Sequence, residues 1–134
     1  MSHPDGLPDL FLDGSLGRLK VPQLLRERGL RLVTLAERYG IPDDERVTDE
    51  RWLRDAGRRG EAVFMKDARV RYKVAEKRAV TQLQVRCFCL SRQDLRADEM
   101  AGRFLDNLHR ITEACRDDGP FIYAVHGRRI DRIL

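Results

Sequence analysis

The chain has 134 residues, long enough for one domain that buries a core without disulfides or metal ions. Its composition, with 42% apolar and 36% charged residues, excludes a wholly disordered chain, and no run approaches the roughly 20 apolar residues of a membrane-spanning helix. The formal net charge is only +4, but residues 1–50 carry −3, residues 51–86 carry +7 and residues 87–134 are neutral. A polyanionic partner is therefore expected at the central stretch.

The cations and cysteines narrow the expected setting of the protein. Of the 26 cations, 22 are arginine, whose guanidinium suits phosphate, although a GC-rich genome also enriches arginine. The chain has three cysteines, an odd number, and their spacing is not that of metal ligands. This pattern indicates a protein of the reducing cytosol rather than one held together by disulfides. The N-terminus lacks the basic and apolar layout of a signal peptide. We therefore expect a cytoplasmic protein that does not contact a membrane.

The first part of the chain predicts two strands and a short helix. Two prolines within residues 1–8 indicate a loose N-terminal arm. The apolar run at 10–13 predicts a buried strand that closes on a Gly-Ser-Leu-Gly turn. A helix is predicted over 22–28, with a proline in its first turn and a glycine as its stop, and a second strand over 30–34.

The remainder continues the alternation of helices and strands. After a loop at 41–44, Thr48 is expected to cap a helix over 49–58. A basic segment at 68–84 is helical or irregular, and apolar residues at spacings of three and four predict one amphipathic helix between Met100 and Cys115. Three further strands are predicted at residues 62–65, 85–90 and 121–125, with a short last strand around Ile130.

This alternation defines the expected fold class. Strands that alternate with helices through short loops indicate an α/β domain in which a mostly parallel sheet of about five strands is covered by helices on both faces. We expect residues 1–134 to form one such three-layer domain. In parallel sheets, ligands collect at the carboxyl ends of the strands, and the functional residues are therefore sought at that edge.

Three aspartates are expected to meet at this edge. Asp13 closes the first strand and Asp67 follows the third, and an acid at the end of an apolar run is costly unless it is paired or binds a cation. Asp49 shares a helix face with Trp52, whereas Glu50 faces Arg54 at the solvent side. The first helical turn also attracts acids through the helix dipole alone, which is the alternative interpretation of Asp49.

Clustered carboxylates are typical of a site for a hard divalent cation. Mg²⁺ and Mn²⁺ prefer oxygen ligands, and such an ion lowers the pKa of a bound water and stabilises charge that grows on a phosphate. The three acids therefore predict a metal site, and the +7 stretch beside it predicts attraction of phosphate. Together they favour hydrolysis of a phosphodiester.

The residues around these acids also match a known family. The matching motifs are, in chain order, Phe11-Leu12-Asp13-Gly14-Ser15-Leu16-Gly17, Thr48-Asp49-Glu50-Arg51-Trp52-Leu53, Val63-Phe64-Met65-Lys66-Asp67 and Gly119-Pro120-Phe121-Ile122-Tyr123-Ala124-Val125-His126. From residue 10 to the C-terminus the chain resembles the PIN-like ribonucleases, and among them the compact VapC-type toxins of bacterial toxin–antitoxin pairs.

The resemblance implies a fold, an activity and partners. It implies a PIN-like domain that cleaves RNA with Mg²⁺ or Mn²⁺ held by Asp13, Asp49 and Asp67, with Ser15 as a hydroxyl that supports the site. It further implies a cognate antitoxin that covers the toxin, and a toxin that often forms a homodimer.

Two positions depart from the family pattern. Where the family commonly has Ser or Thr two residues before the third acid, this chain has Met65. The usual fourth acid has no clear match, because Asp94, Asp98 and Glu99 are all candidates and the latter two serve equally well as the opening turn of a helix.

The basic residues beside Asp67 are the predicted substrate-binding residues. With Ser15, we assign this role to Lys66, Arg69 and Arg71, and Tyr72 lies among them as an aromatic ring for base stacking. The alternative is a solvated loop in an arginine-rich protein.

The leading hypothesis is a metal-dependent endoribonuclease that is the toxin of a type II toxin–antitoxin pair. A non-catalytic nucleic-acid-binding or regulatory module of the same fold is the second hypothesis. The third is a phosphohydrolase with Asp13 as nucleophile, which the haloacid-dehalogenase pattern disfavours because it needs an acid where this chain has Ser15.

Overall fold

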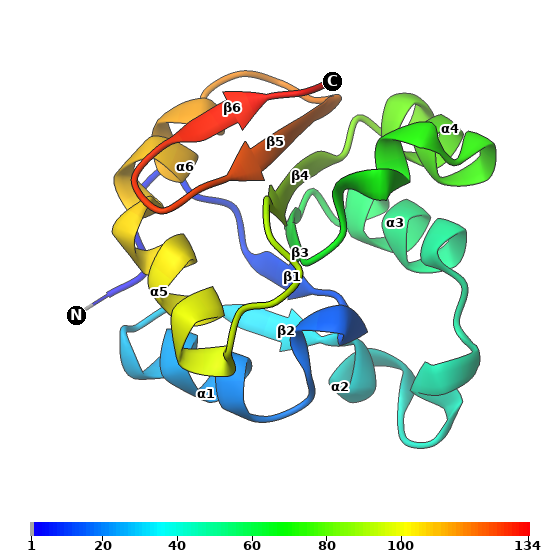
Figure 1. The fold of residues 1–134 in the computed structure, drawn as a ribbon. Helices are drawn as coiled ribbons and strands as arrows, with labels where there is room; N and C mark the ends of the chain where they lie inside the picture. The colour runs from blue at the N-terminus through cyan, green and yellow to red at the C-terminus, as the bar shows by residue number, and fades with distance from the viewer. Residues whose placement is uncertain (1) are drawn as a thin grey trace.

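The sheet contains six strands in the order β2-β1-β3-β4-β5-β6 (Figure 1). The structure is a computed structural model and describes residues 2–134. The strands are β1 (Leu10–Leu12), β2 (Leu32–Thr34), β3 (Ala62–Met65), β4 (Arg86–Leu90), β5 (Phe121–Val125) and β6 (Ile130–Arg132). The first five are parallel, and β6 runs antiparallel to β5. The predicted α/β class with a mostly parallel sheet is therefore confirmed.

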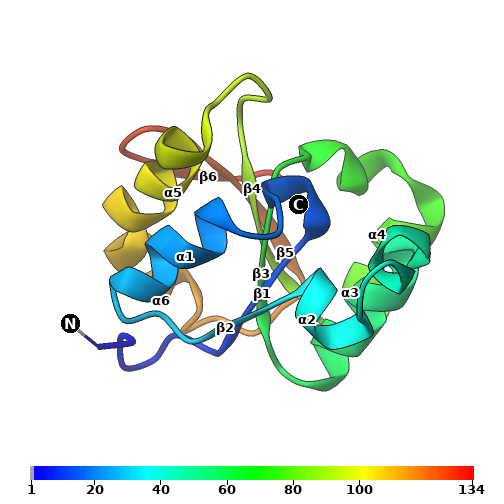
Figure 2. The ribbon, with the colours of Figure 1, turned by 90° about the horizontal axis from the view of Figure 1, so that it is seen from below.

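Helices cover both faces of this sheet (Figure 2). One layer holds α1 (Lys20–Glu27), α5 (Ala97–Asp106) and α6 (Leu108–Ala114), and the other holds α2 (Leu35–Tyr39), α3 (Asp49–Arg58) and α4 (Val74–Gln82). Because successive strand residues face opposite sides, Phe64 packs in the first layer, where it stacks on Phe104 with ring centroids 4.2 Å apart, and Phe11 packs against Trp52 in the second. The three-layer arrangement is the predicted one.

The central strands lie where the apolar runs predicted them because their residues are buried on both faces. Every residue of β1 and β3 is buried, as expected for the middle of a parallel sheet. The first strand ends at Leu12, so that Asp13 lies outside it as the residue that caps a 3-10 turn at Gly14–Leu16. The acid thus leaves the sheet at its carboxyl edge.

The helix α2 was not expected. Residues 35–39 form one turn and a half directly after β2, and Thr34 begins it with a capping box. The Thr34 hydroxyl accepts from the Glu37 backbone N–H at 3.1 Å, and the Glu37 carboxylate accepts from the Thr34 backbone N–H at 2.9 Å. Gly40, at φ 85°, ends the helix.

The single helix predicted between Met100 and Cys115 is wrong, because the chain breaks at Asn107 into α5 and α6. The Asn107 side chain is fully buried, and its amide donates to the carbonyls of Arg103 at 2.8 Å and His126 at 2.9 Å. A side chain that competes for backbone carbonyls interrupts a helix. The apolar pattern continues across the break because both helices cover the same core.

The N-terminal segment is held against the domain rather than loose. Met1 lies outside the described residues, but within residues 2–8 both His3 and Leu7 are buried. The His3 ring lies 2.9 Å from the carbonyl oxygen of Leu7, and its Nδ1 accepts from the backbone N–H of Arg31 at 2.9 Å. Because both ring nitrogens of this buried histidine have partners, it holds the N-terminal segment in place. The prolines of the segment had predicted a loose arm.

The basic segment after β3 has two parts: a 3-10 helix at Ala68–Tyr72 and then α4.

Among residues 2–134, none of the helices combines the length and apolar character needed to cross a membrane.

Candidate active site

The carboxyl ends of β1 and β3 form the edge at which the predicted acids lie. From β1 the sheet extends to β2 on one side and to β3 on the other, which makes the β1–β3 boundary the topological switch point where parallel sheets bind ligands. Asp13 follows β1 directly, and its backbone N–H donates to the Phe64 carbonyl of β3 at 3.1 Å. Asp67 is the second residue after β3.

Asp13 is a half-buried acid with one hydroxyl partner. The Ser15 Oγ donates to Asp13 Oδ2 at 2.7 Å and accepts from the Lys66 backbone N–H at 3.2 Å, so that Ser15 links the ends of β1 and β3. Burial raises the pKa of Asp13, the Ser15 hydroxyl opposes this, and the charge of Asp49 raises the pKa further. Asp13 and Asp49 therefore lie within electrostatic reach of each other.

Asp49 lies in the first turn of α3, on the face that periodicity assigned to it. The indole Nε1 of the fully buried Trp52 donates to Asp49 Oδ1 at 3.1 Å. Glu50 instead pairs with Arg54 at 3.2 Å. Asp49 thus contacts the buried Trp52 and Glu50 contacts Arg54, as the helical spacing predicted, while the role of Asp49 in the site stays a prediction.

Asp67 is bound by a neighbouring cation. The Arg69 Nη2 lies 2.7 Å from Asp67 Oδ2, and the Arg69 backbone N–H donates to Asp67 Oδ1 at 2.8 Å. The hydrogen bond from the Arg69 side chain is the main cause that lowers the pKa of Asp67, which partial burial opposes. Arg69, predicted to bind substrate, contacts this acid in the structure, and its role toward substrate stays a prediction.

The buried Cys89 of β4 is the register partner of Met65 in β3, two residues before Asp67. Burial raises the pKa of Cys89, and the charges of Cys87, Asp67 and Asp13 raise it further while that of Arg71 lowers it. Within residues 2–134, however, no three His, Cys, Asp or Glu side chains gather closely enough to hold a metal ion. The three-acid metal site remains a prediction.

Comparison with known proteins shows the family. A family model described as "PIN like domain" matches residues 8–92. The chain belongs to the PIN-like domain family. Over 128 residues it is also 41% identical to the Mycobacterium tuberculosis (strain ATCC 25618 / H37Rv) protein named "Putative ribonuclease VapC45", an alignment that covers 96% of this chain and 93% of that protein. No solved structure matches the chain.

The candidates for the fourth acid of this PIN-like domain have other partners. Asp94 is paired with Arg92 at 2.8 Å, and Asp98 with Arg96 at 3.3 Å. The Glu99 carboxylate accepts from the Arg96 backbone N–H at 3.0 Å and so caps the start of α5. The helix-opening role considered for Asp98 and Glu99 is the one that the structure shows.

Two basic residues predicted to bind substrate, Arg71 and Lys66, differ in the contacts that they make within the PIN-like domain. Arg71 lies with its guanidinium carbon 4.5 Å from the centroid of the Tyr72 ring. Its buried Nε has no hydrogen-bond partner, and within the described residues its side chain forms no ion pair. The backbone of Lys66 is held by Ser15 and by Gln93, whose Nε2 donates to the Lys66 carbonyl at 2.9 Å.

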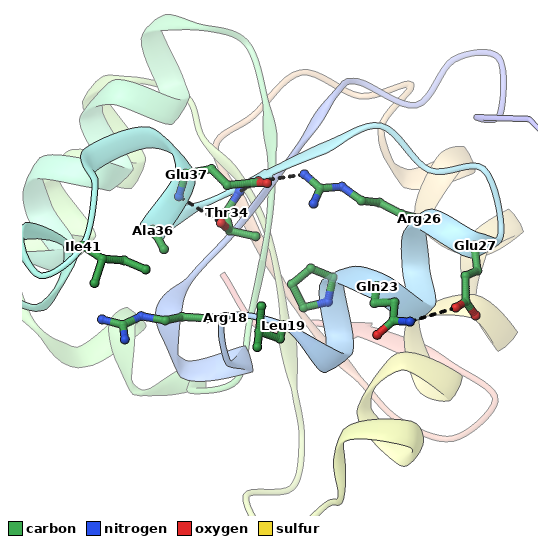
Figure 3. Close-up of a pocket in the computed structure, with 10 residues that line it drawn as sticks. Arg18, Leu19, Gln23, Arg26, Glu27, Thr34, Ala36, Glu37 and Ile41 are labelled. Carbon is green, nitrogen blue, oxygen red and sulfur yellow. Dashed lines mark hydrogen bonds and ion pairs between the residues drawn. The ribbon is translucent and has the colours of Figure 1, made fainter.

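A hollow of the PIN-like domain lies away from the acids, between α1 and α2 (Figure 3). Its volume is about 930 Å³, and the exposed apolar side chains of Leu19 and Ile41 lie along it. Arg26 reaches across this hollow to Glu37 at 2.7 Å. The sequence did not predict this hollow, because the hydrophobic pattern does not distinguish an exposed leucine or isoleucine from one in the core.

Proposed function

We propose that this PIN-like domain is a divalent-metal-dependent endoribonuclease and the toxin of a type II toxin–antitoxin pair. The observation that carries the proposal is the 41% identity, across nearly the whole length of both chains, to a protein named as a VapC ribonuclease. PIN-domain ribonucleases of this type depend in general on a divalent metal ion. We assign the metal here to Mg²⁺ or Mn²⁺ and the ligands to Asp13, Asp49 and Asp67.

The donor chemistry of the three proposed side chains suits such a metal ion. Asp13 is a desolvated carboxylate whose charge repels that of Asp49, and a cation between two such groups relieves both costs. All three proposed side chains offer the oxygen atoms that a hard cation prefers. Asp67, which is paired with Arg69, would be the third ligand if a metal ion took the place of that guanidinium.

Each residue of the proposed site has a distinct part in RNA hydrolysis. When bound, the metal ion supplies an acidified water and a positive charge opposite the scissile phosphate. Ser15 holds the Asp13 carboxylate in place through its hydrogen bond. Lys66 and Arg71 bind the phosphates of the RNA strand, and Arg69, released from Asp67, adds a third cation for the same purpose.

The partners and cellular setting are part of the proposal. We expect a cognate antitoxin protein, a homodimer of the toxin, and the cytoplasm as the site of action. Three free, buried cysteines support a reducing compartment. Co-purification of the protein with the product of a small reading frame beside its gene tests the toxin–antitoxin assignment.

The second candidate is a non-catalytic RNA-binding module of the same fold. The observation in its favour is the ion pair that engages Asp67 with Arg69, together with Met65 where the family has a hydroxyl. Such a module binds RNA in a salt-dependent manner without cleaving it.

Metal removal separates the two candidates. We expect the purified protein to cleave a labelled single-stranded RNA, EDTA to abolish the cleavage, and excess Mg²⁺ or Mn²⁺ to restore it. The Asp13→Asn variant, purified in parallel, controls for contaminating nucleases. Cleavage that persists in EDTA contradicts the metal-dependent mechanism, and the absence of any metal-dependent cleavage favours the binding module.

A further inference from the structure

A second hollow lies beside the acidic edge, where the 3-10 helix after Asp67 meets α4. Its volume is about 560 Å³, and its lining residues are Arg71, Tyr72, Val74, Lys77, Arg78, Thr81 and Gln82. Three of these are cations and none is an acid. The size is within the range of pockets that take small organic molecules.

The hollow presents an aromatic ring to solvent. Tyr72 is 70% exposed and Val74 is 73% exposed, although both are large apolar side chains. The Arg71 guanidinium lies over the Tyr72 ring and holds it from one side. An exposed ring fixed in this way is a surface on which a flat group stacks without the loss of much side-chain freedom.

All but one of the cations of this segment lack an acidic partner within the described residues. Residues 66–78 contain six cations and two acids, and within the described residues the only ion pair among them joins Arg69 to Asp67. The side chains of Arg71, Lys77 and Arg78 are therefore available to an external anion. The buried Nε of Arg71, which has no hydrogen-bond partner, is a further donor that the protein itself leaves unused.

A stacking ring among unpaired cations matches one nucleotide of a single-stranded polymer. The base stacks on the aromatic ring and the phosphates contact the cations, a combination that does not depend on sequence. A protein partner fits less well, because the cations would need an acidic complement and the hollow is small compared with a stable interface.

The position of the hollow relative to the acids fits a strand that passes both. Asp67 and Tyr72 are joined by a single 3-10 helix, which at ~2 Å per residue spans roughly 10 Å. Arg71 lies between them in the chain, and its guanidinium contacts the Tyr72 ring. We propose that Tyr72, together with Arg71, Lys77 and Arg78, forms a subsite that stacks an unpaired base of the RNA on one side of the cleavage position. This inference rests on the proposed function only in taking RNA as the polymer.

RNA binding without metal tests the subsite apart from catalysis. The probe is a fluorescein-labelled oligouridylate, and its anisotropy is measured with the full-length protein in EDTA. We expect Tyr72→Ala to weaken binding roughly tenfold and Tyr72→Phe to leave it unchanged, because stacking needs the ring and not the hydroxyl. Lys77→Gln is expected to weaken binding and to reduce its salt dependence.

Matched controls come from exposed residues outside the hollow. Leu19→Ala removes another exposed apolar side chain, and Lys20→Gln removes a lysine from α1, so both are expected to bind the probe like the wild type. Circular dichroism of each variant checks that it is folded.

The outcomes separate this inference from the proposed function. Equal binding by Tyr72→Ala and wild type, or no binding of the probe by the wild type, overturns the subsite even if metal-dependent cleavage is found. Weaker binding by Tyr72→Ala supports the subsite even if the protein proves inactive. A change in oligomeric state with unchanged RNA binding overturns it in favour of a protein-docking surface.

Discussion

Asp13 and Asp67 follow neighbouring buried strands, yet their environments push their pKa values in opposite directions. Burial raises the pKa of Asp13, whereas the Arg69 guanidinium lowers that of Asp67. A cation therefore favours the charged form of Asp13 most, whereas Asp67 already has a cation beside it. In the proposed site, Asp13 and Asp49 offer the first two ligands and Arg69 competes with the metal ion for the third.

Arg38 and Glu61 form a buried ion pair that fixes α2 to the start of β3. The two guanidinium nitrogens of Arg38 donate to the two carboxylate oxygens of Glu61, at 2.7 Å and 2.5 Å. Both side chains are less than a tenth exposed, and Arg38 also lies over the Phe11 ring. The two parallel hydrogen bonds satisfy both charges where little water reaches them.

Removal of one partner of this pair is expected to be costly. We predict that Glu61→Ala lowers the free energy of unfolding by about 3–5 kcal/mol, because it leaves the buried Arg38 charge without a partner. Urea denaturation measures the loss. Glu113→Ala, which breaks the exposed pair with Arg116, is the control and should cost less than about 1 kcal/mol. An equal loss in both variants contradicts this account of the buried pair.

The sequence predicted the candidate acids better than their partners. Helical periodicity distinguished Asp49 from Glu50 because its geometry is regular, and strand ends located Asp13 and Asp67 for the same reason. The ion pair of Asp67 with Arg69 lies in an irregular segment, where no periodicity determines the direction of a side chain. The exposure of Tyr72 and the free Arg71 Nε likewise depend on packing that only the structure shows.

At the scale of elements, α3 and α4 pack closely at a glycine. A Cβ on Gly57 would lie 2.5 Å from the Leu83 Cβ and 3.0 Å from the Leu83 carbonyl oxygen. In α5, by contrast, a Cβ on Gly102 meets no heavy atom within 4 Å. The two helical glycines are therefore present for different reasons.

Alanine at these two glycines should have opposite effects on stability. We predict that Gly57→Ala destabilises the protein by about 1–3 kcal/mol, because the added methyl forces α3 and α4 apart. Gly102→Ala should stabilise it by roughly 0.5–1 kcal/mol, because alanine favours a helix and the methyl has room. Urea denaturation of both variants measures the difference, and stabilisation by Gly57→Ala contradicts the close approach.

The strands were more predictable than the helices because the five parallel strands are mainly apolar runs bounded by turn residues. The helix α2 has only five residues, and its one signal is the Thr34–Glu37 capping box. The break at Asn107 depends on the carbonyl of His126, nineteen residues along the chain, which no local pattern reveals. Short elements and long-range side-chain bonds are thus where sequence reasoning failed.

At the scale of the whole molecule, the fold shows where the unevenly distributed charge of the chain lies. The segment of residues 51–86, with its net charge of +7, supplies α3, β3 and α4, and it carries Asp67 to the switch point beside Asp13. The acids of the proposed metal site and the cations of the proposed RNA path therefore lie on neighbouring parts of one edge. The net charge of +4 by itself gave no sign of this arrangement.

The most direct test of the proposed function is RNA cleavage in Mg²⁺ by Asp67→Asn. Asparagine caps the following 3-10 helix as aspartate does, so that the fold is expected to persist while the metal-binding charge is lost. We predict that cleavage falls at least roughly a hundredfold, whereas Asp98→Asn, an exposed acid at the start of α5, cleaves like the wild type. Cleavage by Asp67→Asn at the wild-type rate would contradict the account.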